Sequence, residues 1–138
     1  MPVLDRTGND DGLPRSILVV EDEALLAMDV EMVLRNAGFR VVGPAENSAR
    51  AMAILREETL DLTIVDLNLG AELAFSVFHR LEESGIPFII LSGHSRQMIP
   101  ERFRDRPFLQ KPYQIPTLLR MVREVLSDSS VASRRKVG

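Results

Sequence analysis

The stretch Leu62-Thr63-Ile64-Val65-Asp66-Leu67-Asn68-Leu69-Gly70 decides the fold, because a short, mostly apolar run ends there in an acid. A continuous run of this kind is typical of a strand that is buried on both faces of a parallel sheet. Ligands of such sheets bind beyond the carboxyl ends of the strands. Asp66 and Asn68 are therefore candidate functional residues, and the other strands should lie in similar runs.

Similar runs occur at residues 17–20, 40–43, 88–91 and 106–109. Apolar side chains recur at helical spacing in residues 24–34, 49–55, 73–81 and 115–126, with Met28, Met32 and Met52 at core positions of that pattern. Pro100 interrupts residues 95–105, so any helix there is short or kinked. Strand alternating with helix five times predicts an α/β domain, doubly wound, with helices on both faces of a five-stranded parallel sheet.

The chain has 138 residues, a length that suits one domain. Residues 1–14 are rich in Gly, Asp and Pro and are predicted to be a flexible N-terminal segment. The predicted domain covers residues 15–127, and the serine-rich residues 128–138 are expected to be a flexible C-terminal tail. Because so few residues follow the domain, no attached output module is expected, and the protein should act through a partner.

The composition excludes several classes of function. A net charge of −3 gives no hint of the basic face that binds nucleic acid. The absence of cysteine excludes disulfide scaffolds, cysteine zinc sites and thiol catalysis. The longest apolar run, near residues 86–91, is too short to span a bilayer, and the N-terminus lacks a secretory signal. We therefore expect a cytoplasmic protein with no nucleic-acid partner and no membrane insertion.

Polar side chains follow four of the five predicted strands. The set consists of Glu21 and Asp22, Asp66 and Asn68, Ser92, and Lys111. Because the strand ends meet at one edge of the sheet, the carboxylates, the hydroxyl and the ammonium should converge there. Close carboxylates repel each other unless a cation joins them, and Mg²⁺ prefers such oxygen ligands. The combination indicates phosphoryl transfer to a carboxylate, assisted by a divalent ion and an ammonium group.

Each of these residues has a simpler explanation when it is taken alone. Acids such as Glu21 and Asp22 are favoured near helix starts. Asp66 and Ser92 are residue types common in turns and caps, and a lysine before a proline, such as Lys111, is usually solvated. The placement of the whole set at strand ends of one topology favours a functional site.

Four segments resemble bacterial response-regulator receiver domains. They are Val19-Val20-Glu21-Asp22-Glu23, Ile64-Val65-Asp66-Leu67-Asn68-Leu69, Ile90-Leu91-Ser92-Gly93 and Phe108-Leu109-Gln110-Lys111-Pro112-Tyr113. The resemblance covers residues 15–127 and rests on the order and spacing of these segments. It implies a flavodoxin-like sheet with strand order 2-1-3-4-5. It also implies a signalling switch that is not an enzyme, apart from its own aspartyl phosphorylation and dephosphorylation.

The resemblance implies roles for the acidic residues. Asp66 matches the aspartate that receives a phosphoryl group from a sensor histidine kinase or a histidine phosphotransfer protein. Mg²⁺, for which Mn²⁺ can substitute, would be held by Asp22, Asp66 and the backbone carbonyl of Asn68. Glu21 would support the metal through a water molecule.

The resemblance also implies a switch. Ser92 and Lys111 match the hydroxyl and the ammonium that bind the phosphoryl group and act with Asp66 in its transfer. Phe108 matches the aromatic side chain whose rotamer follows the hydroxyl. Phosphorylation would then shift the population between two states and alter binding of a downstream protein, or the phosphate would be relayed. A monomer or weak dimer is expected.

The segment Pro87-Phe88-Ile89-Ile90-Leu91-Ser92-Gly93-His94 resembles the Pro-Phe-x-Phe-Ala-Thr-Gly-Tyr motif of a subgroup of stand-alone receivers. Ile90, Leu91, Ser92 and His94 differ from that motif. The compact region after Ser95 indicates that the fourth helix is short or displaced.

Three other functions are compatible with parts of the pattern. A pseudo-receiver would be an interaction module that is never phosphorylated, against which the full set of acids, Ser92 and Lys111 argues. A flavodoxin-like protein could bind FMN in the same topology, but a single Tyr, no Trp and acids at the phosphate position argue against it. A metal-dependent phosphatase would need a general base, and none is apparent beyond the metal ligands.

Overall fold

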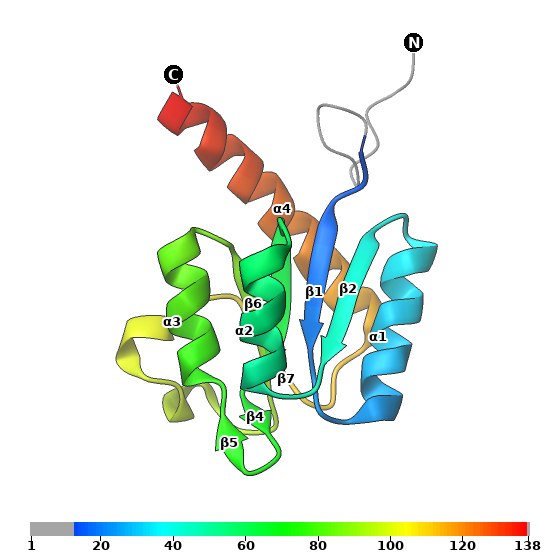
Figure 1. Ribbon diagram of the computed structural model, residues 1–138, viewed down its shortest axis with the longest axis vertical. Helices are drawn as coiled ribbons and strands as arrows, with labels where there is room; N and C mark the ends of the chain where they lie inside the picture. Colours follow the sequence, from blue (N-terminus) through cyan, green and yellow to red (C-terminus); the bar gives the residue numbers. More distant parts are fainter. Residues whose placement is uncertain (1–12, 138) are drawn as a thin grey trace.

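Five parallel strands form the central sheet of the computed structural model, which describes residues 13–137 (Figure 1). Their order is β2-β1-β3-β6-β7. The strands are β1 (Ser16–Val20), β2 (Arg40–Ala45), β3 (Leu62–Asp66), β6 (Phe88–Ser92) and β7 (Phe108–Gln110). Counting only these five strands, the order is the predicted 2-1-3-4-5. Residues 1–12 of the predicted N-terminal segment lie outside the described residues.

Helices cover both faces of the sheet, as predicted (Figure 1). They are α1 (Ala24–Asn36), α2 (Ser48–Glu57), α3 (Phe75–Ser84) and α4 (Ile115–Val137). Apolar residues of α2 and α3 join one buried cluster, while those of α1 and α4 join a second cluster on the other face. The three central strands are buried along their whole length. Alternate residues of each strand therefore supply both cores, which explains the continuous apolar runs in the sequence.

The sequence pattern assigned the wrong face of α1 to the core. Met28 and Met32 are 59% and 56% exposed, and the buried residues are Ala27, Val30 and Leu34. Both sets have helical spacing, so periodicity alone could not separate them. The face of α1 that covers the sheet therefore carries Ala27, Val30 and Leu34. Met52 is partly buried against the core, which agrees with its prediction.

Gly43 allows β2 to continue two residues beyond its predicted end. Its φ angle is +96°, and a Cβ atom there would lie 2.9 Å from the carbonyl oxygen of Val19. The register between β1 and β2 shifts at this point. The irregularity brings the carbonyl of Ala45 to the backbone N–H of Glu21, 2.9 Å away. An edge-strand irregularity thus helps to place the first acidic residue after β1.

A small hairpin, which the sequence pattern did not predict, separates β3 from α3. Strands β4 (Asn68–Leu69) and β5 (Glu72–Leu73) are antiparallel, and Gly70 between them has a φ angle of +65°. Because Leu73 belongs to β5, α3 begins at Phe75 rather than at residue 73. Gly85, with a φ angle of +70°, ends α3 as the sequence indicated.

Residues between β6 and β7 contain no α-helix, although the fivefold alternation implied one there. Two 3₁₀ turns, η1 (Arg96–Met98) and η2 (Glu101–Phe103), take its place. Pro100 lies between them, and its ring cannot continue a preceding helix. The sequence correctly indicated a short or kinked segment, and β7 begins at Phe108 rather than at residue 106.

Helix α4 continues to Val137, well beyond residue 126, where the pattern placed its end. The expected flexible tail at residues 128–138 is therefore helical over most of its length. No Gly or Pro occurs between Thr117 and Val137, so the sequence holds no helix-breaking residue there. Among the described residues, no helix has the length and apolar character required to cross a membrane.

Candidate functional site

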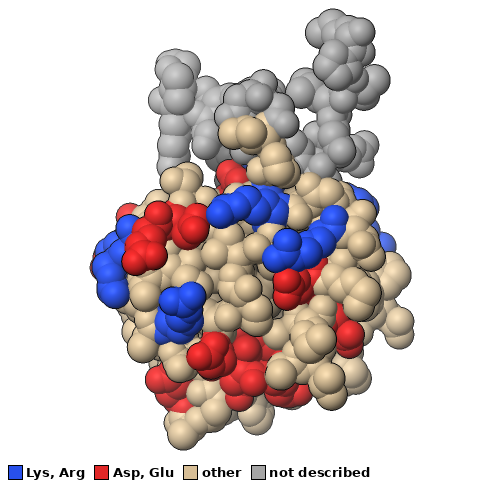
Figure 2. All heavy atoms as spheres, turned by 45° about the vertical axis from the view of Figure 1, so that its right-hand side comes forward, with Lys and Arg blue, Asp and Glu red and all other residues tan. Residues whose placement is uncertain are grey.

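Three carboxylates lie together at the edge of the sheet where the parallel strands end. Asp66 is the last residue of β3, and Glu21 and Asp22 directly follow β1. One oxygen from each residue lies within 4.8 Å of the others. Glu21 and Asp66 are 2% and 3% exposed, while Asp22 is exposed. Figure 2 shows acidic side chains gathered along the lower edge of the molecule, the side on which the strands end.

Lys111, which follows β7, supplies a positive charge to this group. Its Nζ atom forms a salt bridge with Oδ2 of Asp66 and lies 3.2 Å from Oε1 of Glu21. A longer contact of 3.8 Å reaches Glu23. The backbone N–H of Lys111 donates to the carbonyl of Ser92 at 2.7 Å. Adjacent strand ends therefore fix the lysine where its charge partly offsets that of the two buried acids.

The pKa values reflect this crowding of charge. Burial and the neighbouring Asp66 carboxylate raise the pKa of Glu21 to about 7, although Lys111 acts in the opposite direction. Burial alone would lower the pKa of Lys111, but the hydrogen bond and charge of Asp66, together with Glu21, raise it to about 12. The charged form of Glu21 is thus disfavoured beside Asp66, and a further cation would relieve this repulsion.

Hydrogen bonds orient the remaining predicted residues. The backbone N–H of Asn68 donates to Oδ1 of Asp66 at 2.9 Å. Ser92, the last residue of β6, is fully buried, and its Oγ accepts a hydrogen bond from the backbone N–H of His94 at 2.9 Å. Each of these polar atoms is held by backbone at a strand end, so the site is assembled largely before any ligand arrives.

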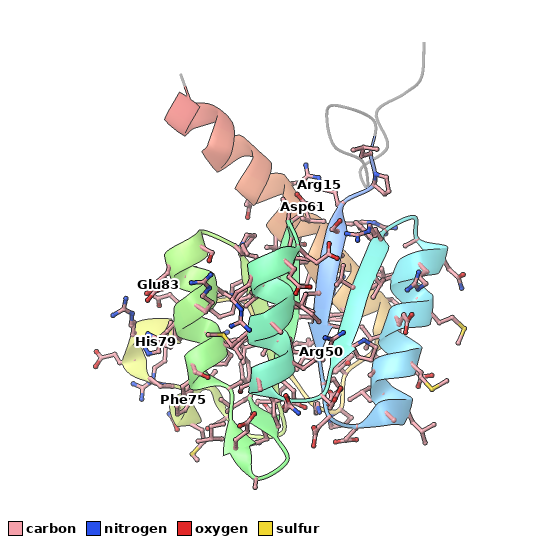
Figure 3. The ribbon with its side chains drawn as sticks, in the orientation of Figure 1. Arg15, Arg50, Asp61, Phe75, His79 and Glu83 are labelled. Atoms are coloured by element: carbon pink, nitrogen blue, oxygen red, sulfur yellow. The ribbon has the colours of Figure 1, made fainter. Side chains whose placement is uncertain are left out.

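Phe108 opens β7 and lies beside Ile90 of β6 in the register. Its ring is half-buried, and the guanidinium carbon of Arg96 lies 5.0 Å from its centre. The exposed His79 lies on α3, where its ring contacts Phe103 at 4.9 Å between centroids (Figure 3). Figure 3 also labels Arg15 and Asp61, which lie at the opposite end of the sheet from the carboxylates.

Sequence reasoning missed several neighbours of the site. A Cβ atom added at Gly70 would lie 3.9 Å from Oδ2 of Asp22, so the hairpin turn approaches the acids closely. Tyr113, two residues after Lys111, has a buried hydroxyl, and burial raises its pKa to about 12. In the sequence, Gly70 shortly after Asp66 was the signal that could have predicted a turn next to the acids.

The donor set fits a hard divalent cation. Carboxylate oxygens from Glu21, Asp22 and Asp66 converge, and the backbone of Asn68, which begins the hairpin of β4 and β5, lies beside them. Oxygen ligands of this kind suit Mg²⁺. The ammonium and the hydroxyl of Ser92 lie at neighbouring strand ends. In this arrangement, a carboxylate oxygen of Asp66 can react with an electrophile. The ammonium of Lys111 and the hydroxyl of Ser92 can stabilise anionic oxygens nearby.

Comparisons with known proteins agree with this geometry. The family model of the response regulator receiver domain matches residues 17–123. The transcriptional regulatory protein PdtaR of Mycobacterium tuberculosis is 31% identical over 117 residues, which cover 82% of this chain and 57% of that protein. The chain thus spans little more than half the length of this relative.

Solved structures share the fold. SdrG from Sphingomonas melonis Fr1 is 36% identical with a TM-score of 0.71, and the match covers 81% of this chain and 96% of that chain. A CheY-like receiver domain protein from Methanospirillum hungatei JF-1 has a TM-score of 0.77 at 18% identity, covering 86% of this chain and 98% of that chain. At that identity the second likeness concerns the fold alone.

Proposed function

Because this chain belongs to the response regulator receiver family, we propose that Asp66 is its phosphoacceptor. The observation that carries the proposal is the buried Asp66 carboxylate at the end of β3, held between the Lys111 ammonium and the Asn68 N–H. The phosphoryl donor is a phosphohistidine of a sensor histidine kinase or a histidine phosphotransfer protein. The proposed receiver unit spans residues 15–127, from which α4 continues.

In the proposed reaction, an oxygen of Asp66 attacks the phosphorus while the bond from phosphorus to the donor imidazole nitrogen breaks. The imidazole leaves with the bonding electron pair and takes up a proton. Lys111, already in contact with Asp66 and Glu21, stays beside the new acyl phosphate and neutralises one of its oxygens. No protein group needs to remove a proton from the ionised carboxylate.

Mg²⁺, or Mn²⁺ in its place, would be held by Asp22, Asp66 and the backbone carbonyl of Asn68, with Glu21 acting through water. When bound, the ion neutralises negative charge on the carboxylates and on the transferred phosphoryl group. The convergence of carboxylate oxygens within 4.8 Å supports this assignment.

Ser92 provides the proposed link between phosphorylation and conformation. Its Oγ now accepts a hydrogen bond from the N–H of His94, so its own proton is free to be donated elsewhere. A phosphoryl oxygen on Asp66 is a strong acceptor, and turning Ser92 toward it would draw the segment after β6 inward. Phe108 would follow, and the altered surface would bind a downstream protein or pass the phosphate on.

The decisive experiment is phosphorylation with acetyl phosphate and Mg²⁺, followed by intact mass. Wild type should gain the mass of one phosphoryl group, and Asp66→Asn should gain none. Asp105→Asn, which removes an exposed acid away from the strand ends, should behave as wild type. The gain should vanish when EDTA replaces Mg²⁺. A folded wild-type chain that gains no mass from acetyl phosphate or from a phosphohistidine donor would instead be a pseudo-receiver.

A further inference from the structure

The hairpin of β4 and β5 lies against both carboxylates that are proposed as metal ligands. Its first residue, Asn68, donates its backbone N–H to Asp66, and its turn residue, Gly70, lies close to Oδ2 of Asp22. Figure 1 shows the hairpin at the lower edge of the molecule, beneath α2 and α3. The position of the hairpin therefore sets where the backbone of Asn68 lies relative to the two acids.

Glu72 joins this hairpin to α2. Its Oε1 accepts a hydrogen bond of 2.7 Å from the backbone N–H of Ser48, the first residue of α2. The first N–H groups of a helix lack partners within it, and this end of the helix attracts negative charge. Hydrogen bonding from Ser48 lowers the pKa of Glu72 below 4.5, so the side chain is ionised at neutral pH. Glu72 pairs with Leu69, the neighbour of Asn68.

Helix α2 is a firm anchor for this contact. Oδ1 of Asn47, the N-cap residue, accepts from the backbone N–H of Arg50 at 2.8 Å, which satisfies a different donor from the one that Glu72 uses. Ala51, Ile54 and Leu55 of the same helix are buried in the core. The helix end thus keeps its place through packing and capping that do not involve the hairpin, and it can hold Glu72 fixed.

We propose that Glu72 is a positioning residue for the phosphoacceptor site. By holding the hairpin against the N-terminus of α2, it keeps the backbone carbonyl of Asn68 where Mg²⁺ would bind. The inference rests on the proposed function. Loss of the contact lets the hairpin sample other positions, so its first effect is weaker Mg²⁺ affinity, and slower phosphorylation at limiting Mg²⁺ follows from that.

Two single variants remove the contact from opposite ends. Glu72→Ala removes the acceptor, and Ser48→Pro removes the donor N–H while it keeps a residue that suits the first helical position. Asn47, which precedes it, is extended, with φ −153° and ψ 172°, as a residue before proline should be. Glu57→Ala, at the other end of α2, is the control with the same change of charge.

The test is the Mg²⁺ dissociation constant from isothermal titration calorimetry without any phosphoryl donor. Glu72→Ala and Ser48→Pro should each raise it about tenfold, the scale on which outer contacts act at metal sites. The double variant should bind Mg²⁺ no more weakly than the weaker-binding single variant, because both substitutions remove the same hydrogen bond. Glu57→Ala should match wild type. The amide signal of Asn68 should shift less at saturating Mg²⁺ in both single variants.

The outcomes separate this inference from the proposed function. If wild type binds Mg²⁺ and the constant for Glu72→Ala rises less than about threefold, Glu72 has no positioning role. Additive losses in the double variant would also overturn the inference. A wild-type chain that binds no Mg²⁺ overturns the proposed function and this inference together. Thermal melting in EDTA establishes that each variant is folded. If Glu72→Ala is unfolded, Ser48→Pro alone tests whether the contact between Glu72 and Ser48 affects Mg²⁺ binding.

Discussion

The guanidinium carbon of Arg96 lies 5.0 Å from the centre of the Phe108 ring. The same guanidinium donates hydrogen bonds to the backbone carbonyls of Arg104 and Arg106. One side chain therefore ties the segment between β6 and β7 to the aromatic residue that is proposed to move with Ser92. In a segment that has 3₁₀ turns instead of an α-helix, such side-chain donors satisfy carbonyls that helical bonds would otherwise occupy.

Arg96→Ala should lower the free energy of unfolding by about 1–2 kcal/mol, because it removes a cation–π contact and hydrogen bonds to two carbonyls. Urea denaturation measures this change. Arg50→Ala, in which an exposed arginine of α2 is removed (Figure 3), should change stability much less. Arg96→Lys should remain destabilised, because an ammonium group cannot reproduce the planar fork of donors. Equal effects of Arg96→Ala and Arg50→Ala would refute this role.

Phe103 should be the main apolar anchor of the same segment. It is 1% exposed, and its ring centre lies 5.4 Å from that of Phe78 and 6.3 Å from that of Phe88. Phe103→Ala should cost about 3–5 kcal/mol of stability, because a cavity opens in a closely packed core. The half-buried Phe75 is the matched control, and Phe75→Ala should cost clearly less in the same urea titration.

Glu82 should make a pH-dependent contribution to stability. Hydrogen bonds from Arg102 and then Arg106 hold its pKa below the ordinary 4.5. A depressed folded-state pKa contributes stability above the unfolded-state value, and this is lost as the pH falls through the folded-state value. Glu82→Gln should therefore be less stable than wild type at neutral pH and equal to it in acid.

The measurement is the urea midpoint of both chains at neutral pH and again below the pKa of Glu82. Glu83→Gln removes the neighbouring exposed carboxylate of α3 (Figure 3) and should show no comparable loss at neutral pH. A deficit of Glu82→Gln that persists unchanged in acid would mean that packing, not charge, accounts for it.

Lys111→Met should separate two effects of the ammonium. Removing a positive charge beside Asp66 and Glu21 should tighten Mg²⁺ binding, by about threefold or more given the Coulomb energy of unit charges at this range. Phosphorylation by acetyl phosphate at saturating Mg²⁺ should nevertheless slow strongly. Arg56→Met, an exposed cation of α2, should leave both quantities unchanged. Weaker Mg²⁺ binding in Lys111→Met would contradict the electrostatic argument.

The placement of the site could be predicted because strand ends are marked clearly in this chain. The strands that end at Asp66 and Ser92 are buried at every position and consist mostly of apolar residues. Such strands are buried on both faces of the sheet, whichever helices pack against it. The topology then brings Glu21, Asp66 and Lys111 together, whatever the details of the loops.

The remaining features depend on contacts that a local pattern does not encode. Both faces of α1 carry apolar residues at helical spacing, so the exposure of Met28 depends on which face packs against the sheet. Glu72 and Arg96 resemble ordinary surface residues in the sequence, yet their partners lie 24 and 8 or more residues away. The end of α4 was missed because polar residues were taken as a tail, although nothing in them breaks a helix.

The salt bridge between Lys111 and Glu21 joins residues that are 90 positions apart in the chain. Lys111 follows the last strand, so a nascent polypeptide that has left the ribosome only as far as β6 holds its acids without their ammonium. Such an incomplete product would hold the carboxylates of Glu21 and Asp66 together without the ammonium group that partly offsets their charge. The full set of charges at this edge of the sheet is thus assembled late in biosynthesis, only after nearly the whole domain has been translated.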